Sequence, residues 1–525
     1  MKQKMNSKNI INTCLILFFV FVLFYPIATM LSKITISGFK TIVNSNQFAS
    51  VCINSVYTAL IATIITLVLS FIAAWCLERI NIRFKGILSI VFIIPMLIPS
   101  ISHAFGLVAL FGANGLITNI LNINSNIYGP IGIILGSIMY SFPVSFLMFS
   151  NVLHYEDGTQ YKAASVLGIP KLNTFMDITL PYIKKTIISA FFAVFTMIVT
   201  DYGVPLMIGG KTMTLSTLMY NKAVGMLDYS SGSVIGLFLL VPAFIAFIVD
   251  ILNQENSSNG FVSTKVENKN DKLSKILSYV YCLIISICVF APIISFLIMV
   301  FETKYPVDAA FTLKHILSTI KKGSNKYLLN SLIYAISTAT FGTIIAFICA
   351  YMNSRIKGKL SKITHLICLV SMAIPGIVLG LSYVMSFHGQ FIYGTVILIV
   401  IVNTIHFFSS PYLMMFNSLE KINSNLESTG LCLGIKRIRI IIDVIIPKVK
   451  YTLFDMATYF FVNSMMTISA VSFLAPPSPK PIALMINQFE AQLLMESAAF
   501  VSLLILIVNL LLKVISYFVK RKLEY

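Results

Sequence analysis

The chain has 525 residues, of which 57% are hydrophobic and only 11% are charged. Because a water-soluble domain carries about a quarter charged residues, this composition excludes an ordinary soluble enzyme and favours an integral membrane protein. A net charge of +19 would suggest a nucleic-acid partner in a soluble chain. Here the basic residues lie mostly between apolar blocks, where they orient a protein in a lipid bilayer, so no nucleic-acid partner is expected.

Apolar blocks long enough to cross the hydrocarbon layer as helices recur along the whole sequence. They predict an all-α integral membrane protein with about twelve transmembrane helices. The first block is too long for a secretory signal and is expected to stay as a span. The predicted spans are 10–32, 50–77, 87–112, 130–153, 183–205, 232–252, 273–300, 328–352, 362–387, 391–416, 449–474 and 497–519.

The basic residues between these spans predict the orientation of the chain. With the N-terminus inside, the inner segments hold 27 Lys and Arg and the outer segments hold ten. Because positive charge concentrates on the cytoplasmic side, both termini are expected in the cytoplasm of a cell with this protein in its plasma (inner) membrane. The outer loop 301–327 runs against this trend, because it carries five lysines.

The sequence repeats itself. A polar stretch at 254–272 is expected to be a cytoplasmic linker between a first half, 1–253, and a second half, 273–525. Two six-helix halves in the same orientation imply a pseudo-twofold axis along the membrane normal, with a path between the halves. The matched positions, which share a single sequence offset, are Asn54-Ser55 with Asn330-Ser331, Arg79 with Arg355, and Ile98-Pro99-Ser100 with Ile374-Pro375-Gly376.

The most informative repeat follows the fourth predicted span of each half. The first copy reads KAASVLGIPKLNTFMDITLP (162–181) and the second STGLCLGIKRIRIIIDVIIP (428–447). The spacing from glycine to proline is identical in the two copies, since 181 minus 168 equals 447 minus 434. Each loop is expected to form a short helix, break at the glycine, form a second short helix and restart at the proline. Ala163, Ala164 and Leu167 are expected on one face of the first short helix.

These loops resemble the EAA loop of permease subunits of bacterial ABC importers, and the resemblance covers nearly the whole chain. It implies that each loop docks as a coupling helix on a cytoplasmic ATPase, which would bind ATP, while this chain binds no cofactor and is no enzyme. The acidic position of the motif is Lys162 in one copy and Ser428 in the other, with Glu427 one residue early, and Thr429-Gly430 replaces the two alanines, so weaker docking is expected there. The coupling residues are Lys162, Ala163, Ala164, Leu167, Gly168, Pro181, Glu427, Ser428, Thr429, Gly430, Leu433, Gly434 and Pro447.

The resemblance narrows to fused, two-half permeases for iron(III), thiamine and 2-aminoethylphosphonate. The segments DYGVPLMIGG (201–210) and MTISAVSFLAP (466–476) are similar to matching segments of that group. SAVSFL looks closest to the aminoethylphosphonate permeases, so a phosphonate is the expected substrate, with iron(III) or thiamine as alternatives. The implied partners are two ATPase subunits and an extracellular or periplasmic substrate-binding protein.

Several polar residues and prolines inside apolar segments are candidates for the translocation path. Asp201 is the main one, because an acid in an apolar span is by default functional, although its predicted place near the outer interface fits a helix end as well. The six histidines lack metal-ligand spacing, and neither a catalytic group nor a metal site is expected. The path candidates are Pro99, Ser100, His103, Asp201, Tyr202, Pro375, Ser469 and Ser472.

A twelve-helix secondary transporter is the alternative from another class, since it would also have two parallel halves. Such a transporter should couple through ionisable residues near the midplane, and these are scarce here. Gly210-Lys211-Thr212 imitates the end of a phosphate-binding loop, but Pro205 stands where that motif needs its first glycine.

Overall fold

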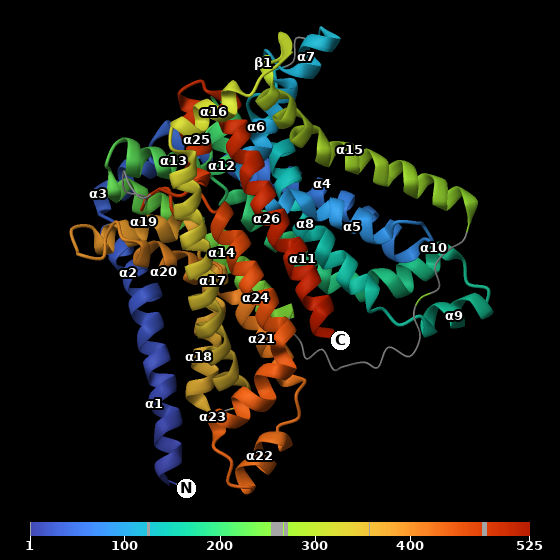
Figure 1. Ribbon diagram of the computed structural model, residues 1–525, viewed down its shortest axis with the longest axis vertical. Helices are drawn as coiled ribbons and strands as arrows, with labels where there is room; N and C mark the ends of the chain where they lie inside the picture. The colour runs from blue at the N-terminus through green and yellow to red at the C-terminus, as the bar shows by residue number, and fades with distance from the viewer. Residues whose placement is uncertain are drawn as a thin grey trace.

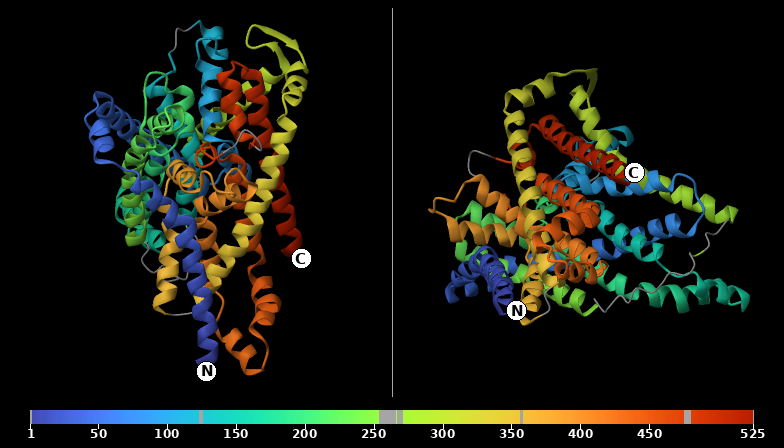
Figure 2. Two further views of the ribbon diagram at one scale, coloured as in Figure 1. Left: turned by 90° about the vertical axis from the view of Figure 1, so that its left-hand side faces the viewer. Right: turned by 60° about the horizontal axis from the view of Figure 1, so that its bottom comes forward.

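The computed structural model describes residues 2–122, 126–253, 266, 271–355, 358–474 and 480–524. Its regular structure is helical apart from one short hairpin, and the helices form two bundles that diverge toward one end of the molecule (Figure 1). The expected linker 254–272 lies almost entirely outside the described residues. We call the end that carries α9 and α22 the loop end, and the end that carries α7 and β1 the opposite end (Figures 1 and 2).

The helices of the first half include α4, the longest helix of the described residues. They are α1 (Lys2–Phe19), α2 (Tyr25–Ser32), α3 (Ile36–Val43), α4 (Asn46–Arg79), α5 (Lys85–Ile93), α6 (Ser100–Phe111), α7 (Leu116–Leu121), α8 (Pro130–His154), α9 (Thr159–Val166), α10 (Lys171–Thr174), α11 (Leu180–Val199), α12 (Gly203–Ile208), α13 (Leu215–Tyr220) and α14 (Tyr229–Asn253).

The second half follows a similar order, with a hairpin after its first helix, two helices where the first half has α8, and non-helical residues where the first half has α12. Its elements are α15 (Lys272–Phe301), β1 (Glu302–Lys304), β2 (Asp308–Phe311), α16 (Lys314–Lys321), α17 (Ser324–Arg355), α18 (Lys359–Val370), α19 (Gly376–Phe387), α20 (Val396–His406), α21 (Ser409–Glu420), α22 (Asn425–Cys432), α23 (Arg437–Ile440), α24 (Ile446–Met466), α25 (Ala483–Ala491) and α26 (Met495–Glu524). The hairpin is antiparallel and lies in the loop 301–327.

Nine helices of the described residues are long and apolar enough to cross a membrane, and the number rises to eleven if two bent pairs each count as one span. These pairs are α18 with α19 and α20 with α21. The expected span at 449–474 is not among them, because α24 ends at Met466 and carries Lys448, Lys450 and Asp455. The all-α membrane class is confirmed.

The third predicted span of each half is broken rather than continuous. In the first half, α5 passes through a 3-10 turn and the chain becomes extended at Ile98, with φ −122° and ψ 150°, before α6 begins. In the second half the corresponding bend between α18 and α19 is 105°. Proline lacks a backbone N–H and disfavours the helical conformation of the residue before it, so Pro99 and Pro375 set these breaks.

The fifth predicted span of each half ends before its expected end. Where 183–205 was predicted, α11 stops at Val199 and the chain turns through Asp201 into α12. The residues after α24, from Thr467 to Leu474, form turns. Both breaks place non-helical backbone inside the protein.

The first helix of each half packs against the other half. The Phe19 ring of α1 meets Phe408 at 5.1 Å between centroids, and the Tyr383 hydroxyl of α19 donates to the Val22 carbonyl. Reciprocally, Phe296 of α15 stacks on Phe105 of α6 at 5.3 Å. The largest cluster of buried apolar residues therefore draws on both halves.

The crossing of α15 over α6 makes a prediction about Gly106. A Cβ atom built on Gly106 would overlap the Cβ of Pro292, so Gly106→Ala overpacks this contact. We expect a loss of about 1–3 kcal/mol of stability, measured as a lower midpoint of thermal unfolding in detergent. Gly86→Ala is the matched control, because no atom lies within 4 Å of its Cβ position, and its midpoint should not fall. Equal midpoints for the two variants would contradict the crossing.

Candidate functional site: paired loops and a central cavity

The two repeated loops have the same backbone course. Each begins with a helix of eight residues, α9 or α22, and then turns at a glycine in the left-handed region, with φ 68° at Gly168 and 78° at Gly434. A four-residue helix follows and runs through a π-helical turn into α11 or α24. Pro181 and Pro447 stand in the first turn of those long helices, directly after the π-helical turns.

The exposed face of α9 differs from the one expected. Val166 and Leu167 are 88% and 75% exposed, whereas Ala164 is buried against the rest of the loop. Ala163 is exposed with them, as residues three and four apart share a helix face. The apolar surface is therefore formed by Ala163, Val166 and Leu167, and Ala164 supports it from behind.

The second loop presents its apolar surface in the same way. Leu433 is 74% exposed, and Thr429 and Cys432 lie on the same side, while Gly430 faces inward as Ala164 does. A Cβ atom on Gly430 would lie 2.7 Å from Cδ1 of Ile440, so the glycine permits close packing of α22 on α23. Compared with Ala163-Ala164, the sequence Thr429-Gly430 therefore changes only one exposed side chain, that of Thr429, because Gly430 is buried.

One glutamate beside each loop is buried and paired with an arginine of a long helix. Glu427 forms an ion pair with Arg355 of α17, at 2.7 Å between Oε1 and Nε. Glu156, just before α9, forms the corresponding pair with Arg79 of α4. Lys162 and Ser428, at the acidic position of the motif, are both exposed. The exposed faces of α9 and α22 therefore do not include the buried glutamates, Glu156 and Glu427.

Burial and hydrogen bonding shape the electrostatics of the first loop. Desolvation raises the pKa of the Glu156 carboxyl, although the Tyr161 hydroxyl and the Arg79 guanidinium act in the opposite direction. Burial and the neighbouring carboxylate raise the pKa of the Tyr161 phenol, so this group keeps its proton. Its hydroxyl donates to Oε1 of Glu156 at 2.5 Å.

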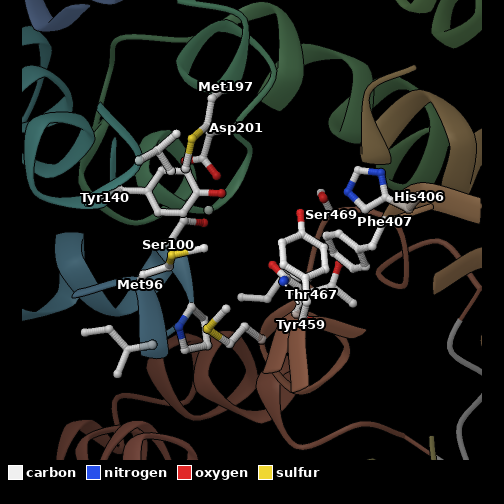
Figure 3. Close-up of a pocket in the computed structure, with 17 residues that line it drawn as sticks. Met96, Ser100, Tyr140, Met197, Asp201, His406, Phe407, Tyr459, Thr467 and Ser469 are labelled. Carbon is white, nitrogen blue, oxygen red and sulfur yellow. Dashed lines mark hydrogen bonds between the residues drawn. The ribbon is translucent and has the colours of Figure 1, made fainter. Parts of the chain in front are cut away.

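A cavity lies between the two halves, formed by two adjoining hollows of about 300 and 430 Å³. Tyr140 and Asp201 of the first half face His406 and Ser469 of the second across it (Figure 3). Asp250 lines the second hollow, and neither hollow has Lys or Arg among the described residues that line it. The ionisable groups of Asp, His, Lys or Arg at this cavity are thus Asp201, Asp250 and His406.

The cavity repeats the internal symmetry of the chain. Tyr140 corresponds to His406 and Asp201 to Thr467 by the offset that relates the two loops, since 406 minus 140 and 467 minus 201 both equal 434 minus 168. These four residues all line the first hollow. The prolines at the helix breaks also take part, Pro99 in one hollow and Pro375 in the other. Matched positions from both halves therefore surround one space, as a pseudo-twofold axis requires.

The structure brings five of the eight predicted path residues to this cavity, namely Pro99, Ser100, Asp201, Pro375 and Ser469. Asp201 also bonds to the start of a helix, since its Oδ2 accepts the N–H of Val204 in α12 at 2.8 Å.

The other three path candidates do not line either hollow. His103 is buried, with Nε2 3.0 Å from the carbonyl of Pro95. Tyr202 is fully buried, with its ring 4.5 Å from that of Tyr220, and Ser472 bonds to the Ser469 carbonyl.

Sequence reasoning missed Tyr140, Tyr459, His406 and Asp250 at the cavity. The sequence offset between the two loops carried a signal for one pair, because it places Tyr140 opposite His406. Their unlike side chains hid that match from a search for identical residues.

A family model described as the inner membrane component of binding-protein-dependent transport systems matches residues 66–255 and 340–525. The match covers more than half of the chain and occurs once in each half, so the protein belongs to this family. The resemblance to ABC importer permeases is confirmed, and the chain is a permease component, not an enzyme. This family assignment excludes the secondary transporter.

Two relatives match over most of their length. The chain is 25% identical over 492 residues to the putative ferric transport system permease protein FbpB 1 of Haemophilus influenzae, with 88% of this chain and 77% of that protein covered. It is 26% identical to the ferric transport system permease protein FbpB of Actinobacillus pleuropneumoniae, with 86% and 68% covered. The crystal structure of a bacterial alginate ABC transporter in complex with alginate pentasaccharide-bound periplasmic protein is similar over 51% of this chain and 99% of that chain, with a TM-score of 0.41 and 16% identity.

The cavity predicts which positions water-borne reagents reach. In a background with the eight native cysteines replaced by serine, Ser469→Cys should react readily with a small charged thiol reagent, because Ser469 lines both hollows. Ser102→Cys is the control, since Ser102 is fully buried and bonds to Ser502 at 3.0 Å. Labelling rates measured by mass spectrometry test this, and equal rates at the two positions would contradict an aqueous cavity.

Proposed function

We propose that this chain forms the whole membrane pore of an ATP-driven importer in the bacterial plasma (inner) membrane, with both termini cytoplasmic. An external binding protein delivers the substrate, and two cytoplasmic ATPase subunits dock on the loops that contain α9 and α22. The observation that carries this proposal is the pair of matched loops, each with an exposed apolar helix face and a left-handed glycine behind it. One docking loop in each half fits two copies of one ATPase.

For the substrate we propose iron(III). Two relatives named for ferric transport match most of the chain, which supports this choice. The cavity supports it as well, because its described lining includes the carboxyl of Asp201 and no Lys or Arg, whereas a phosphonate group would need cationic partners to offset its desolvation. The phosphonate expected from the sequence stays a prediction without support from these relatives, and so does thiamine.

Alternating access requires the ATPase to favour one state of the pore over the other. Shifting a two-state population from 1:99 to 99:1 takes about 5.5 kcal/mol, and the docked loops are the elements that would transmit that difference. No group of three or more His, Cys, Asp or Glu residues is placed to hold a metal ion within the described part of the chain. In this proposal the binding protein selects the cargo.

Transport assays distinguish the candidate substrates. Cells that carry the permease with its ATPase and binding protein should take up radiolabelled iron(III), and an iron(III) chelator should abolish that uptake because it removes the substrate. Excess 2-aminoethylphosphonate should have no effect. Uptake of labelled aminoethylphosphonate that is insensitive to the chelator would reject iron(III) and leave the family assignment intact.

The left-handed glycines test the docking role. Gly434→Val puts a β-branched residue at φ 78°, which costs about 1–2 kcal/mol and should distort the turn behind α22. We expect less ATPase to co-purify with the tagged permease. Gly434→Asn is the matched control, because asparagine tolerates this conformation and no atom lies within 4 Å of the Cβ position. If both variants retain the ATPase equally, the turn does not hold a docking surface.

A further inference from the structure

In each half one long helix is bonded at its loop end and again within its first third. At the loop end of α4, Arg79 pairs with Glu156, and both side chains are buried. The Arg79 guanidinium also lies 5.6 Å from the ring centroid of Tyr161 on α9, and Tyr161 bonds to Glu156. The cluster of Arg79, Glu156 and Tyr161 therefore ties α9 to the end of α4.

The second half builds the same connection with the residue types exchanged. Arg355 and Tyr351 of α17 both contact Glu427 of α22, at 2.7 and 2.8 Å. By the offset between the loops, Glu427 corresponds to Tyr161, so the helix that supplies a tyrosine in one half supplies the carboxylate in the other. The cluster of arginine, carboxylate and tyrosine is kept although its members change places.

The first third of each long helix is bonded in an equally matched way. Ser55 of α4 accepts the backbone N–H of Leu215 at 2.7 Å, and Ser331 of α17 accepts that of Ile482 at the same distance. The preceding residues, Asn54 and Asn330, donate to the carbonyls of Met213 and Lys480. Each Asn-Ser pair is therefore hydrogen-bonded to the segment that leads into α13 or α25.

In the first half, the segment that leads into α13 is also hydrogen-bonded to a residue of the cavity. Ser216, next to Leu215, donates its hydroxyl to the carbonyl of Asp201 at 2.6 Å. The bonded serine and the bonded arginine are equally far apart in both helices, since 79 minus 55 equals 355 minus 331. At a rise of about 1.5 Å per residue this separation is about 36 Å, long enough to span the hydrocarbon layer.

We propose that α4 and α17 are struts that carry movement of the docked loops to the segments that lead into α13 and α25, of which the first bonds to Asp201 at the cavity. Arg79, Glu156, Arg355 and Glu427 are positioning residues at the loop end, and Ser55 and Ser331 are positioning residues toward the opposite end. The inference rests on the proposed function, because it assumes that an ATPase docks on the loops and moves them. Burial of the ion pairs favours a rigid joint, since a buried charge that loses its partner is strongly destabilised. One continuous helix therefore joins the two bonded points in each half.

The test uses the complete transporter, with ATPase and binding protein, in proteoliposomes, and measures iron(III) taken up per ATP hydrolysed. Glu427→Gln removes the charge at the loop end of α17 and Ser331→Ala the acceptor in its first third. Each should lower the ratio about fivefold or more, because a lost coupling energy of about 1 kcal/mol or more has this size. ATPase co-purification should stay at the wild-type level.

Combining the two variants separates a strut from two independent sites. Distant substitutions normally have additive effects, whereas both bonded points of one strut lie on the same route. The double variant should therefore be no worse than the more severe single variant. Asp455→Asn is the matched control, because its ion pair with Lys520 joins α24 to α26 and involves neither strut, and its ratio should stay at the wild-type value.

Several results would overturn the strut. The first is an unchanged ratio of iron(III) uptake to ATP hydrolysis in both Glu427→Gln and Ser331→Ala. The second is a double variant in which the two losses multiply. The third is a loss of ATPase binding in Glu427→Gln, which would make Glu427 part of the docking surface. If Glu427→Gln fails to assemble, Tyr351→Phe removes only one hydroxyl, and its ratio must fall about twofold or more for the strut to stand. A wild-type transporter without ATP-driven uptake would reject the proposed function itself, and wild-type uptake with unchanged variants would reject the strut alone.

Discussion

Backbone polar groups inside a membrane must find partners within the protein, and the architecture of this permease follows from that constraint. Helices satisfy it along most of the chain, so each place where a helix stops needs its own solution. The breaks at Pro99 and Pro375 and the turns at Asp201 and Thr467 all lie where the two halves meet. Irregular backbone is tolerated there because it is enclosed by protein and lines a cavity, and this is also where a transported solute needs polar groups.

Internal duplication made much of this arrangement predictable. The Gly-to-Pro spacing of the loops located the loop turns, because proline and glycine restrict the backbone in ways that the sequence displays directly. The matched Ile-Pro pairs revealed the duplication, but the helix breaks that they mark were not predicted. The straightness of the spans at 87–112 and 362–387 was predicted wrongly, since apolar length alone cannot show that a proline splits a block into two helices. The short hairpin at 302–311 gave no periodic signal, because its strands are too short to display one.

The roles of individual side chains were harder to predict, because they depend on partners far along the chain. Glu427 looked like a displaced docking residue, but Arg355 holds it inside the protein. Thr429-Gly430 looked like a weak copy of two alanines, but Ile440 occupies the space that an alanine side chain would need. In both cases the physical reason is a tertiary contact, which neither helix propensity nor motif spacing records.

The exchange of first helices between the halves has a consequence for the order in which the protein is made. Phe19 of α1 packs on Phe408. Because most of the chain lies between these two residues, α1 leaves the ribosome long before its partner does. Throughout that interval the helix must reside in lipid without its native neighbours. Its span, Ile10–Ser32, is suited to lipid because it is strongly apolar and only 28% of its 18-residue apolar window is buried in the folded protein. The first half consequently reaches its final packing only when more than half of the second half has been made, and a chain cut short after residue 253 would keep an unpaired helix.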